Sequence, residues 1–347
     1  MAQVRVIETL LALCAAVLLF GALYSARSIL APVACSLFII AVVWPFQRRL
    51  QARIPKLLAL VVTVSVILLV IAVLGSLIVW GFSRIGQWII ANSLRFQVLY
   101  MQASDWLEGH GFSIASQMAQ SFNVRWLVRI VQEIGGRLQG MISFVIITAV
   151  FTVLGLLEVD VTQRNLARLK NDEIRQTLLQ AGKSIAAKFQ RYMLVRSAMS
   201  VMTGAVIWGV ALLAGLELAT AWGVIAFVFN YIPFIGPLIA TVFPTLFAMA
   251  QFESWELAVI VFLCLNLIQF LIGSYLEPRI AGAALSVSPF LILLAVFFWS
   301  FLWGIPGAFI GVPIVIAVLT VCEQHEATKW VATLVSGRDE ATTHLPT

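Results

Sequence analysis

Eight long runs without charged side chains dominate the sequence and restrict the chain to a membrane fold. A helix needs about 20 apolar residues to cross the roughly 30 Å hydrocarbon core of a bilayer, and each run reaches or approaches that length. Glu8, at the edge of the first run, is the only acidic or basic residue among them. The runs are residues 7–24, 29–46, 57–82, 141–157, 197–216, 218–250, 257–276 and 289–322.

The composition excludes a water-soluble protein. Apolar residues make up 61% of the 347 positions and charged residues only 11%, whereas an average globular chain has about 25% charged residues. We therefore predict an all-α integral membrane protein with about eight transmembrane segments. The expected parts are three N-terminal spans (1–82), a long amphipathic outer segment (83–140), a fourth span (141–157), a basic cytoplasmic helical linker (158–196), a C-terminal transmembrane core (197–322) and a cytoplasmic tail (323–347).

The basic side chains predict the orientation of the spans. Cytoplasmic loops carry an excess of Lys and Arg, and roughly two thirds of the 22 basic residues fall on the inner side if the N-terminus is inside. We therefore expect both termini in the cytoplasm and segment 83–140 outside. The net charge of +6 is then explained by loops that face anionic lipid, so no nucleic-acid partner is expected.

Two runs are too long to be single straight helices. Run 218–250 would extend about 50 Å as one helix, and its middle carries two prolines and a glycine that remove backbone hydrogen bonds. Run 289–322 repeats this arrangement. Either run is a kinked span or a re-entrant hairpin. Non-helical backbone at membrane depth is tolerated where it lines a protein-enclosed or water-filled cavity, and such breaks mark binding sites in many transporters. The candidate residues at the breaks are Asn230, Pro233, Gly236, Pro237, Gly304, Pro306, Gly307, Gly311 and Pro313.

Run 257–276, between the two broken runs, carries a polar face. Asn266, Gln269, Gly273 and Glu277 are spaced by three or four residues, which places them on one side of a helix. A polar stripe on a span faces the protein interior or a solute pathway, although hydrogen bonds that only hold helices together are an equal alternative. We predict that Asn266 and Gln269 line the pathway. Glu277 and Arg279 are expected to form an ion pair at the membrane boundary.

Signals for soluble chemistry are missing from the sequence. The four cysteines lie in or at the end of apolar runs without a C-x-x-C spacing, and the three histidines are scattered. Neither a disulfide framework nor a metal site is therefore expected. The sequence also lacks a complete phosphate-binding loop and a Gly-x-Ser-x-Gly motif. We expect neither an enzyme nor a cofactor.

The C-terminal third resembles the autoinducer-2 exporter family of bacterial multi-pass membrane proteins. The resemblance rests on order and spacing from residue 197 to 322, whereas the N-terminal half agrees only in layout. Ser288 stands where many members have His, which removes a titratable group from this position. The motifs are Asn230-Tyr231-Ile232-Pro233-Phe234-Ile235-Gly236-Pro237, Glu277-Pro278-Arg279-Ile280, Ser288-Pro289, Phe298-Trp299 and Trp303-Gly304-Ile305-Pro306-Gly307-Ala308-Phe309-Ile310-Gly311-Val312-Pro313.

The resemblance implies an inner-membrane permease that exports small solutes such as autoinducer-2, or in some members exchanges monovalent cations for protons. Our leading hypothesis is a secondary transporter that exports a small polar solute. A cation/proton antiporter usually has a carboxylate at membrane depth, whereas Glu158, Glu217 and Glu277 sit at span ends. A non-transporting membrane scaffold is the third hypothesis. The large apolar surface leaves homo-oligomerisation open.

Overall fold

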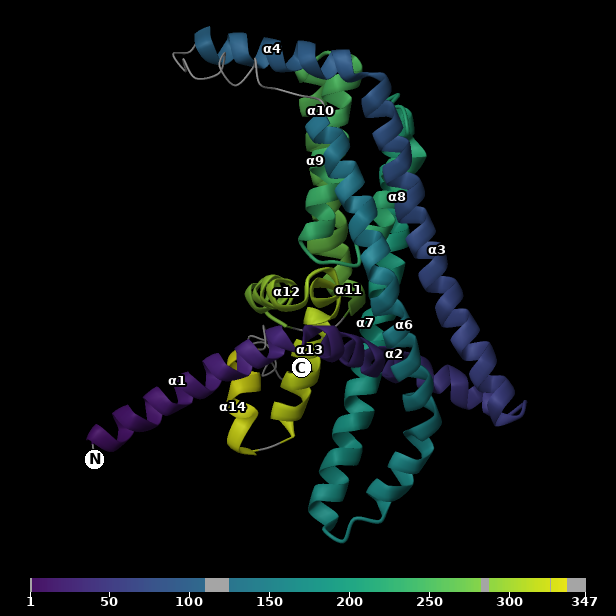
Figure 1. The fold of residues 1–347 in the computed structure, drawn as a ribbon, viewed down its shortest axis with the longest axis vertical. Helices are drawn as coiled ribbons and strands as arrows, with labels where there is room; N and C mark the ends of the chain where they lie inside the picture. The colour runs from purple at the N-terminus through teal and green to yellow at the C-terminus, as the bar shows by residue number, and fades with distance from the viewer. Residues whose placement is uncertain (1, 110–124, 282–286, 325, 336–347) are drawn as a thin grey trace, which may run out of the picture. The chain divides into compact units, whose positions relative to one another are not determined.

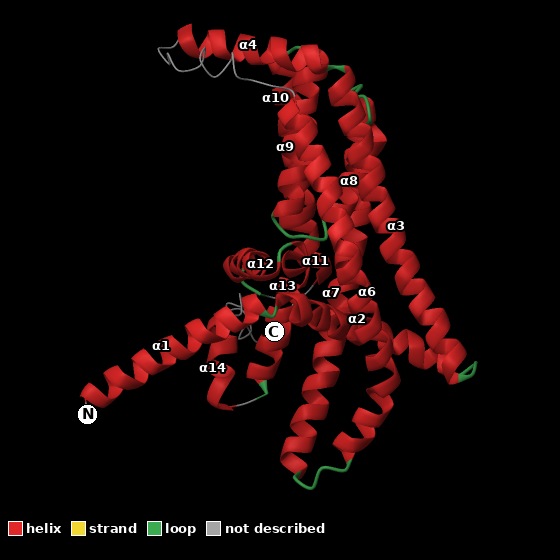
Figure 2. Ribbon diagram, in the orientation of Figure 1, coloured by secondary structure: helices red, strands yellow, loops and turns green. Residues whose placement is uncertain are grey.

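The computed structural model describes residues 2–109, 125–281, 287–324 and 326–335, and within these residues it contains helices and no strands (Figures 1 and 2). The helices are α1 (Ala2–Ser25), α2 (Arg27–Gln51), α3 (Lys56–Ala91), α4 (Ser93–Gly109), α6 (Arg125–Ala167), α7 (Asp172–Leu213), α8 (Ala219–Phe229), α9 (Ile235–Phe252), α10 (Trp255–Phe270), the π-helix η1 (Leu271–Leu276), α11 (Glu277–Ala281), α12 (Pro289–Trp303), α13 (Ile305–Glu323) and α14 (Glu326–Val335).

The prediction of an all-α membrane protein with about eight spans is confirmed. Eight helices in the described part of the chain are long and apolar enough to cross a membrane. Six of them lie in α1, α2, α3, α7, α9 and α13. The seventh is the part of α6 from residue 141 to 167, and the eighth is the continuous stretch 255–280, which contains α10. The shorter apolar helices α8 and α12 accompany them.

Local sequence explains where several helices begin. Ser288 accepts a hydrogen bond from the backbone N–H of Leu291 at 3.3 Å and caps α12, whose first residue is a proline. Proline is favoured at that position because its missing N–H would have no intrahelical partner there. Ser254 caps α10 in the same way, and Asn171 accepts a hydrogen bond from Ile174 at 3.1 Å at the start of α7.

The chain divides into two compact units. Unit 1 contains residues 1–66, 143–192 and 283–347, and unit 2 contains residues 67–142 and 193–282. Helices α3, α6 and α7 each contribute residues to both units.

Unit 1 is built around the helical hairpin of α12 and α13, which packs on α2 while α12 also contacts α1. Aromatic rings lie at these contacts, with centroids 5.3 Å apart for Phe20 of α1 and Phe298 of α12, and 6.2 Å apart for Phe38 of α2 and Phe309 of α13. The indole N–H of Trp303 donates to the carbonyl oxygen of Leu23 at 3.2 Å. The second broken run is thus anchored to the N-terminal helices.

Unit 2 has a core made by α3, α7, α8, α9 and α10. Trp222 of α8 and Phe247 of α9 lie with ring centroids 5.2 Å apart. Helices α7 and α8 cross at two glycines, since a Cβ on Gly204 would lie 2.9 Å from the Gly223 oxygen and the reverse distance is also 2.9 Å. Small residues allow such close approach between helices in membranes.

Gln251 holds together the open end of the hairpin formed by α8 and α9. Its side-chain oxygen accepts from the backbone N–H of Glu217 at 2.8 Å, and its amide nitrogen donates to the carbonyl oxygen of Gly215 at 2.8 Å. Both partners belong to the connection that precedes α8. The hairpin is therefore fixed at its base, opposite its turn.

Candidate functional site

The first broken run is a helical hairpin. Helix α8 ends at Phe229, α9 begins at Ile235, and the two helices pack against each other. Close contacts occur both near the turn, at Gly236, and far from it, between Trp222 and Phe247, as expected for antiparallel arms. The structure therefore favours the hairpin over the kinked span that the sequence left open.

The first arm of this hairpin is too short to cross a membrane by itself. Helix α8 has 11 residues and is about 16 Å long, which is roughly half of a hydrocarbon core. The backbone at the turn is unusual, because Phe234 has a φ of 63°, a conformation that a bulky side chain rarely adopts. Pro237 is the third residue of α9, where its missing N–H removes no helical hydrogen bond.

Helix α7 presents polar side chains to this turn. Asn230 is 6% exposed, and its amide donates to the hydroxyl of Ser200, which is completely buried, at 3.3 Å. The hydroxyl of Tyr231 donates to the hydroxyl of Ser197 at 3.0 Å. Both partners lie on α7, so the break is tied to α7 by side-chain hydrogen bonds.

Arg196 begins the same face of α7 and forms an ion pair with Glu277. One guanidinium nitrogen of Arg196 lies 2.7 and 2.9 Å from the two carboxylate oxygens. The side chains are 7% and 28% exposed, respectively. The sequence alone places Arg196 in the basic cytoplasmic linker, because a count of charges between spans treats every charged residue as part of a loop.

The ion pair expected between Glu277 and Arg279 is a wrong prediction. Residues two apart on a helix point to different sides and do not face each other. Glu277 therefore reaches Arg196, while the guanidinium carbon of Arg279 lies 4.1 Å from the centre of the Tyr275 ring. This contact is a cation–π interaction.

A π-helix precedes Glu277 and was not expected from the sequence. Residues 271–276 form η1 between α10 and α11, and π-turns within helices occur frequently at functional sites. Its Ile272 packs with Val195 and Met199 of α7. The π-helix thus adjoins the face of α7 that carries Arg196.

The two predicted polar residues of α10 differ in their surroundings. The amide of Asn266 donates to the carbonyl oxygen of Phe262 at 2.8 Å, within its own helix. The amide nitrogen of Gln269 is buried and has no hydrogen-bond partner among the described residues. Gln269 is therefore the better candidate for contact with a solute.

Two further buried polar atoms on α7 are unsatisfied in the described part of the chain. They are the Nε of Arg196 and the hydroxyl of Thr203, one turn before and one turn after Ser200. A buried polar group without a partner is costly, and water or a bound polar molecule is a usual partner. We use the name α7 cluster for Arg196, Ser197, Ser200, Thr203, Asn230, Tyr231 and Glu277.

The α7 cluster contains hydroxyls, an amide and one ion pair. Within the described residues no three His, Cys, Asp or Glu side chains gather as metal ligands would. Sequence reasoning identified Asn230 and Glu277 but not the members on α7. The spacing of Arg196, Ser200 and Thr203 by four and three residues was a readable signal of one polar helix face.

The second broken run, in unit 1, is also a hairpin, and its turn is tightly packed. Gly304 alone connects α12 to α13, with φ 67° and ψ −143°, a region open essentially to glycine. A Cβ on Gly307 would overlap the carbonyl oxygen of Trp299, and one on Gly311 would lie 2.9 Å from that of Ala295. Pro306 falls in the first turn of α13, and Pro313 is buried within α13.

The predicted site residues thus separate into two groups. Unit 2 contains Asn230, Pro233, Gly236, Pro237, Asn266, Gln269, Glu277 and Arg279. Unit 1 contains Gly304, Pro306, Gly307, Gly311 and Pro313. Polar contacts characterise the turn in unit 2, whereas the contacts of Gly307 and Gly311 in unit 1 are with backbone and aromatic atoms.

Comparison with known proteins agrees with this architecture. The family model described as AI-2E family transporter matches residues 13–327. The AI-2 transport protein TqsA of Escherichia coli K12 is 26% identical over 317 residues, which is 90% of each chain. YhhT of the same organism, named only as a transport protein, is 24% identical over 88% of this chain and 87% of its own.

A further relative comes from Borreliella burgdorferi and is named only as a transport protein. It is 29% identical over 201 residues, which covers 58% of this chain and 56% of that relative. The match therefore spans little more than half of the relative's length. Because the family model covers most of the sequence, and because the helices have the length and composition of membrane spans, the chain belongs to the AI-2E family of transporters.

Proposed function

We propose that the protein is a secondary transporter that exports a small, neutral, polar solute such as autoinducer-2 past the α7 cluster. The observation that carries the proposal is the buried contact of Asn230 with Ser200 at a helix break, beside two unsatisfied polar atoms of α7. Free polar groups at a broken helix can hold a polar solute within a membrane. The name of TqsA supports autoinducer-2 as the first solute to test.

The charges of the α7 cluster favour a neutral solute. Its cation and its anion are both engaged with each other, at 2.7 and 2.9 Å, so the cluster has no net charge. The remaining groups are hydroxyls and an amide, which donate and accept hydrogen bonds without preferring either ionic sign. A hydroxyl-rich solute can exchange hydrogen bonds with them.

Monovalent cation/proton exchange is the second candidate function. Glu277 favours it, since this carboxylate belongs to the α7 cluster and is 28% exposed. Against it, both carboxylate oxygens already accept hydrogen bonds from the guanidinium of Arg196. Flux of sodium or potassium driven by a pH gradient, without flux of autoinducer-2, would favour this second function.

Purified protein in proteoliposomes provides the test of transport. Autoinducer-2, matched neutral polyols, and sodium and potassium ions are assayed with and without a pH gradient. We expect flux of autoinducer-2 or a related polyol. A lack of flux of every solute would instead support the membrane scaffold.

Substitutions at the break should lower this flux. We expect Ser200→Ala and Asn230→Leu each to reduce solute flux by about fivefold or more, because a hydrogen bond contributes roughly 1 kcal/mol. Ser36→Ala is the matched control, since Ser36 is also buried but donates within its own helix, to Val33 at 2.7 Å. Equal solute flux in all three variants would show that the α7 cluster does not lie on the solute path.

The distribution of basic residues places both termini in the cytoplasm in our proposal, and this orientation can be measured. In a background without native cysteines, we expect a cysteine replacing the exposed Asp105 of α4 to react with an impermeant reagent added from outside. A cysteine replacing Lys170, in the exposed turn between α6 and α7, should react only from the cytoplasmic side. The reverse pattern would invert the proposed topology.

A further inference from the structure

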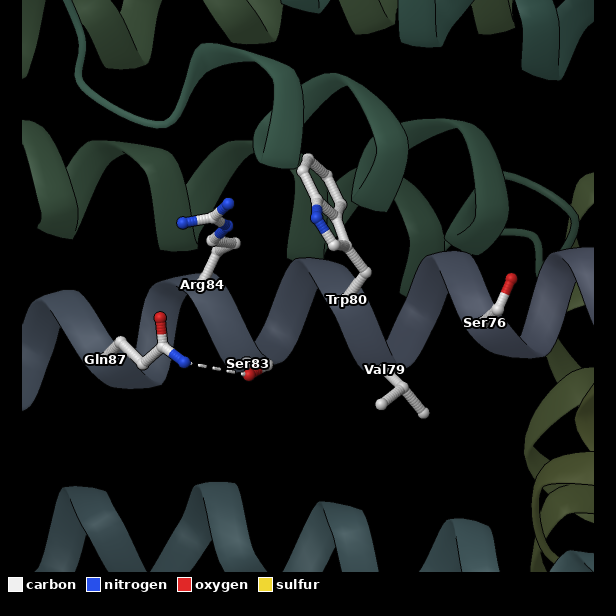
Figure 3. A pocket seen from close by; sticks show the side chains of 6 residues that line it. All are labelled: Ser76, Val79, Trp80, Ser83, Arg84 and Gln87. Atoms are coloured by element: carbon white, nitrogen blue, oxygen red, sulfur yellow. Dashed lines mark hydrogen bonds between the residues drawn. The ribbon is translucent and has the colours of Figure 1, made fainter.

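A groove runs along α3 and is not part of the α7 cluster. It has a volume of about 610 Å³ and is lined by Ser76, Val79, Trp80, Ser83, Arg84 and Gln87. Figure 3 shows these six side chains on successive turns of the same helix, with the guanidinium of Arg84 and the indole of Trp80 projecting from it. All six belong to unit 2.

The groove occupies the side of α3 that faces away from the core of unit 2. Ile85 and Trp88 are buried in that core, and Gly81 approaches Ile225 of α8. At 100° per residue, Ser76, Val79, Ser83 and Gln87 point away from this core. Arg84 lies at the edge of the core side, since it is three residues from Gly81 and four from Trp88, and all six groove residues are exposed. Helix α3 is long and apolar enough to cross a membrane, so lipid can reach an exposed side of it.

The chemistry of the groove changes along its length as that of a phospholipid does. Ser76, Val79 and Trp80 belong to the apolar run that ends at Phe82, and the hydroxyl of Ser76 donates to the carbonyl oxygen of Val73 in its own helix at 2.8 Å. Ser83, Arg84 and Gln87 follow the end of this run. The polar end of the groove is therefore at the depth of the lipid headgroups, and its apolar end is at the depth of the acyl chains. Tryptophan is enriched at this boundary.

The charge of Arg84 is not balanced by any acidic side chain that the structure describes. In the same unit, Arg196 pairs with Glu277 at 2.7 Å and Arg95 with Glu253 at 3.8 Å. Arg84 has no carboxylate partner among the residues that the structure describes. A charged side chain at the membrane boundary calls for a counter-charge, and the planar guanidinium is suited to bind phosphate through two parallel hydrogen bonds.

We propose that the α3 groove binds one anionic phospholipid, with its phosphate on Arg84 and its first acyl carbons on Val79 and Trp80. The hydroxyl of Ser83 accepts from the amide of Gln87 at 3.5 Å, so its own proton is free to donate to a phosphate oxygen. The second amide proton of Gln87 is a further donor. The proposal is independent of which solute the protein transports.

Lipid titration of the purified, delipidated protein tests this site. Phosphatidylglycerol is added in a neutral detergent, and the rise of the melting temperature and the number of lipids retained in native mass spectrometry are measured. We expect Arg84→Gln to need about tenfold more phosphatidylglycerol for half of the wild-type shift, since hydrogen bonds to charged groups are among the strongest. Arg84→Lys should fall between the two.

The control is Arg175→Gln, which removes the same charge from the first turn of α7, where Arg175 pairs with Asp172 at 2.8 Å. It should bind lipid as the wild type does. Zwitterionic phosphatidylcholine, which has a phosphate but no net charge, should give a weaker shift. Inorganic phosphate and neutral polyols should not displace phosphatidylglycerol.

Four results would overturn the proposal. Equal lipid affinity of Arg84→Gln and Arg175→Gln would show that Arg84 does not bind the lipid phosphate. Displacement by inorganic phosphate would assign the groove to a free anion, and displacement by a polyol would assign it to a solute. A change in the oligomeric mass of Arg84→Gln, with lipid retention unchanged, would show that a second copy of the chain covers the groove.

Discussion

Glu277→Gln is expected to destabilise the protein by about 3–5 kcal/mol, because it leaves the guanidinium of Arg196 buried without its partner. Arg196→Gln should reduce stability less. The unpaired Glu277 is 28% exposed and can reach water, whereas Arg196 is 7% exposed. The double variant Arg196→Met/Glu277→Met removes both charges and should recover most of the lost stability. Thermal unfolding in detergent measures all three.

The surface pair of Lys56 and Asp160 is the matched control. Its atoms also lie 2.7 Å apart, but the side chains are 45% and 35% exposed, and exposed pairs contribute under about 1 kcal/mol. Lys56→Gln should therefore change stability little. If Arg279→Gln destabilises the protein as much as Glu277→Gln, then Glu277 is paired with Arg279 after all.

Gly307→Ala is expected to disrupt the hairpin of α12 and α13. The added methyl group would overlap the backbone oxygen of Trp299, and backbone cannot move aside as the end of a flexible side chain can. Overpacking in a well-packed core costs typically 1–3 kcal/mol and occasionally more. We expect a loss of at least about 3 kcal/mol, measured as thermal stability and as folded protein in the membrane fraction.

Gly273→Ala, in the π-helix, is the control for this substitution. No atom lies within 4 Å of the position that its Cβ would occupy, and alanine favours helix over glycine by about 1 kcal/mol. Its stability should equal or exceed that of the wild type. Similar melting temperatures for the two variants would mean that α12 and α13 do not approach each other at Gly307.

The spans and the breaks could be predicted from the sequence because both depend on local chemistry. An uncharged apolar run of about 20 residues has few alternatives to a spanning helix. Two prolines and a glycine within eight residues, as at Pro233, Gly236 and Pro237, prevent a continuous helix. Whether each broken run folds back depends on which arms pack together, and the sequence left that open.

The side chains that bond to residues at and near the first helix break could not be predicted, because they lie far away in the sequence. Ser200 and Asn230 are 30 residues apart and Arg196 and Glu277 are 81 apart. Adjacency in sequence suggested Arg279 as the partner of Glu277, and the geometry of a helix excludes it. The left-handed backbone of Phe234 and the π-helix 271–276 have no local signature in the residues that form them.

The two hairpin turns bring opposite ends of helix dipoles together. At 230–234 the C-terminus of α8 meets the N-terminus of α9, and Gly304 joins α12 and α13 in the same way. The backbone groups at the first turn are bonded within it, since Ile235 donates to the carbonyl oxygen of Pro233 at 2.7 Å and Gly236 to that of Ile232 at 2.9 Å. Each helix end carries about half an elementary charge of opposite sign, so the two ends nearly cancel. A turn of this kind attracts neither anions nor cations strongly, which is compatible with a solute that carries no charge.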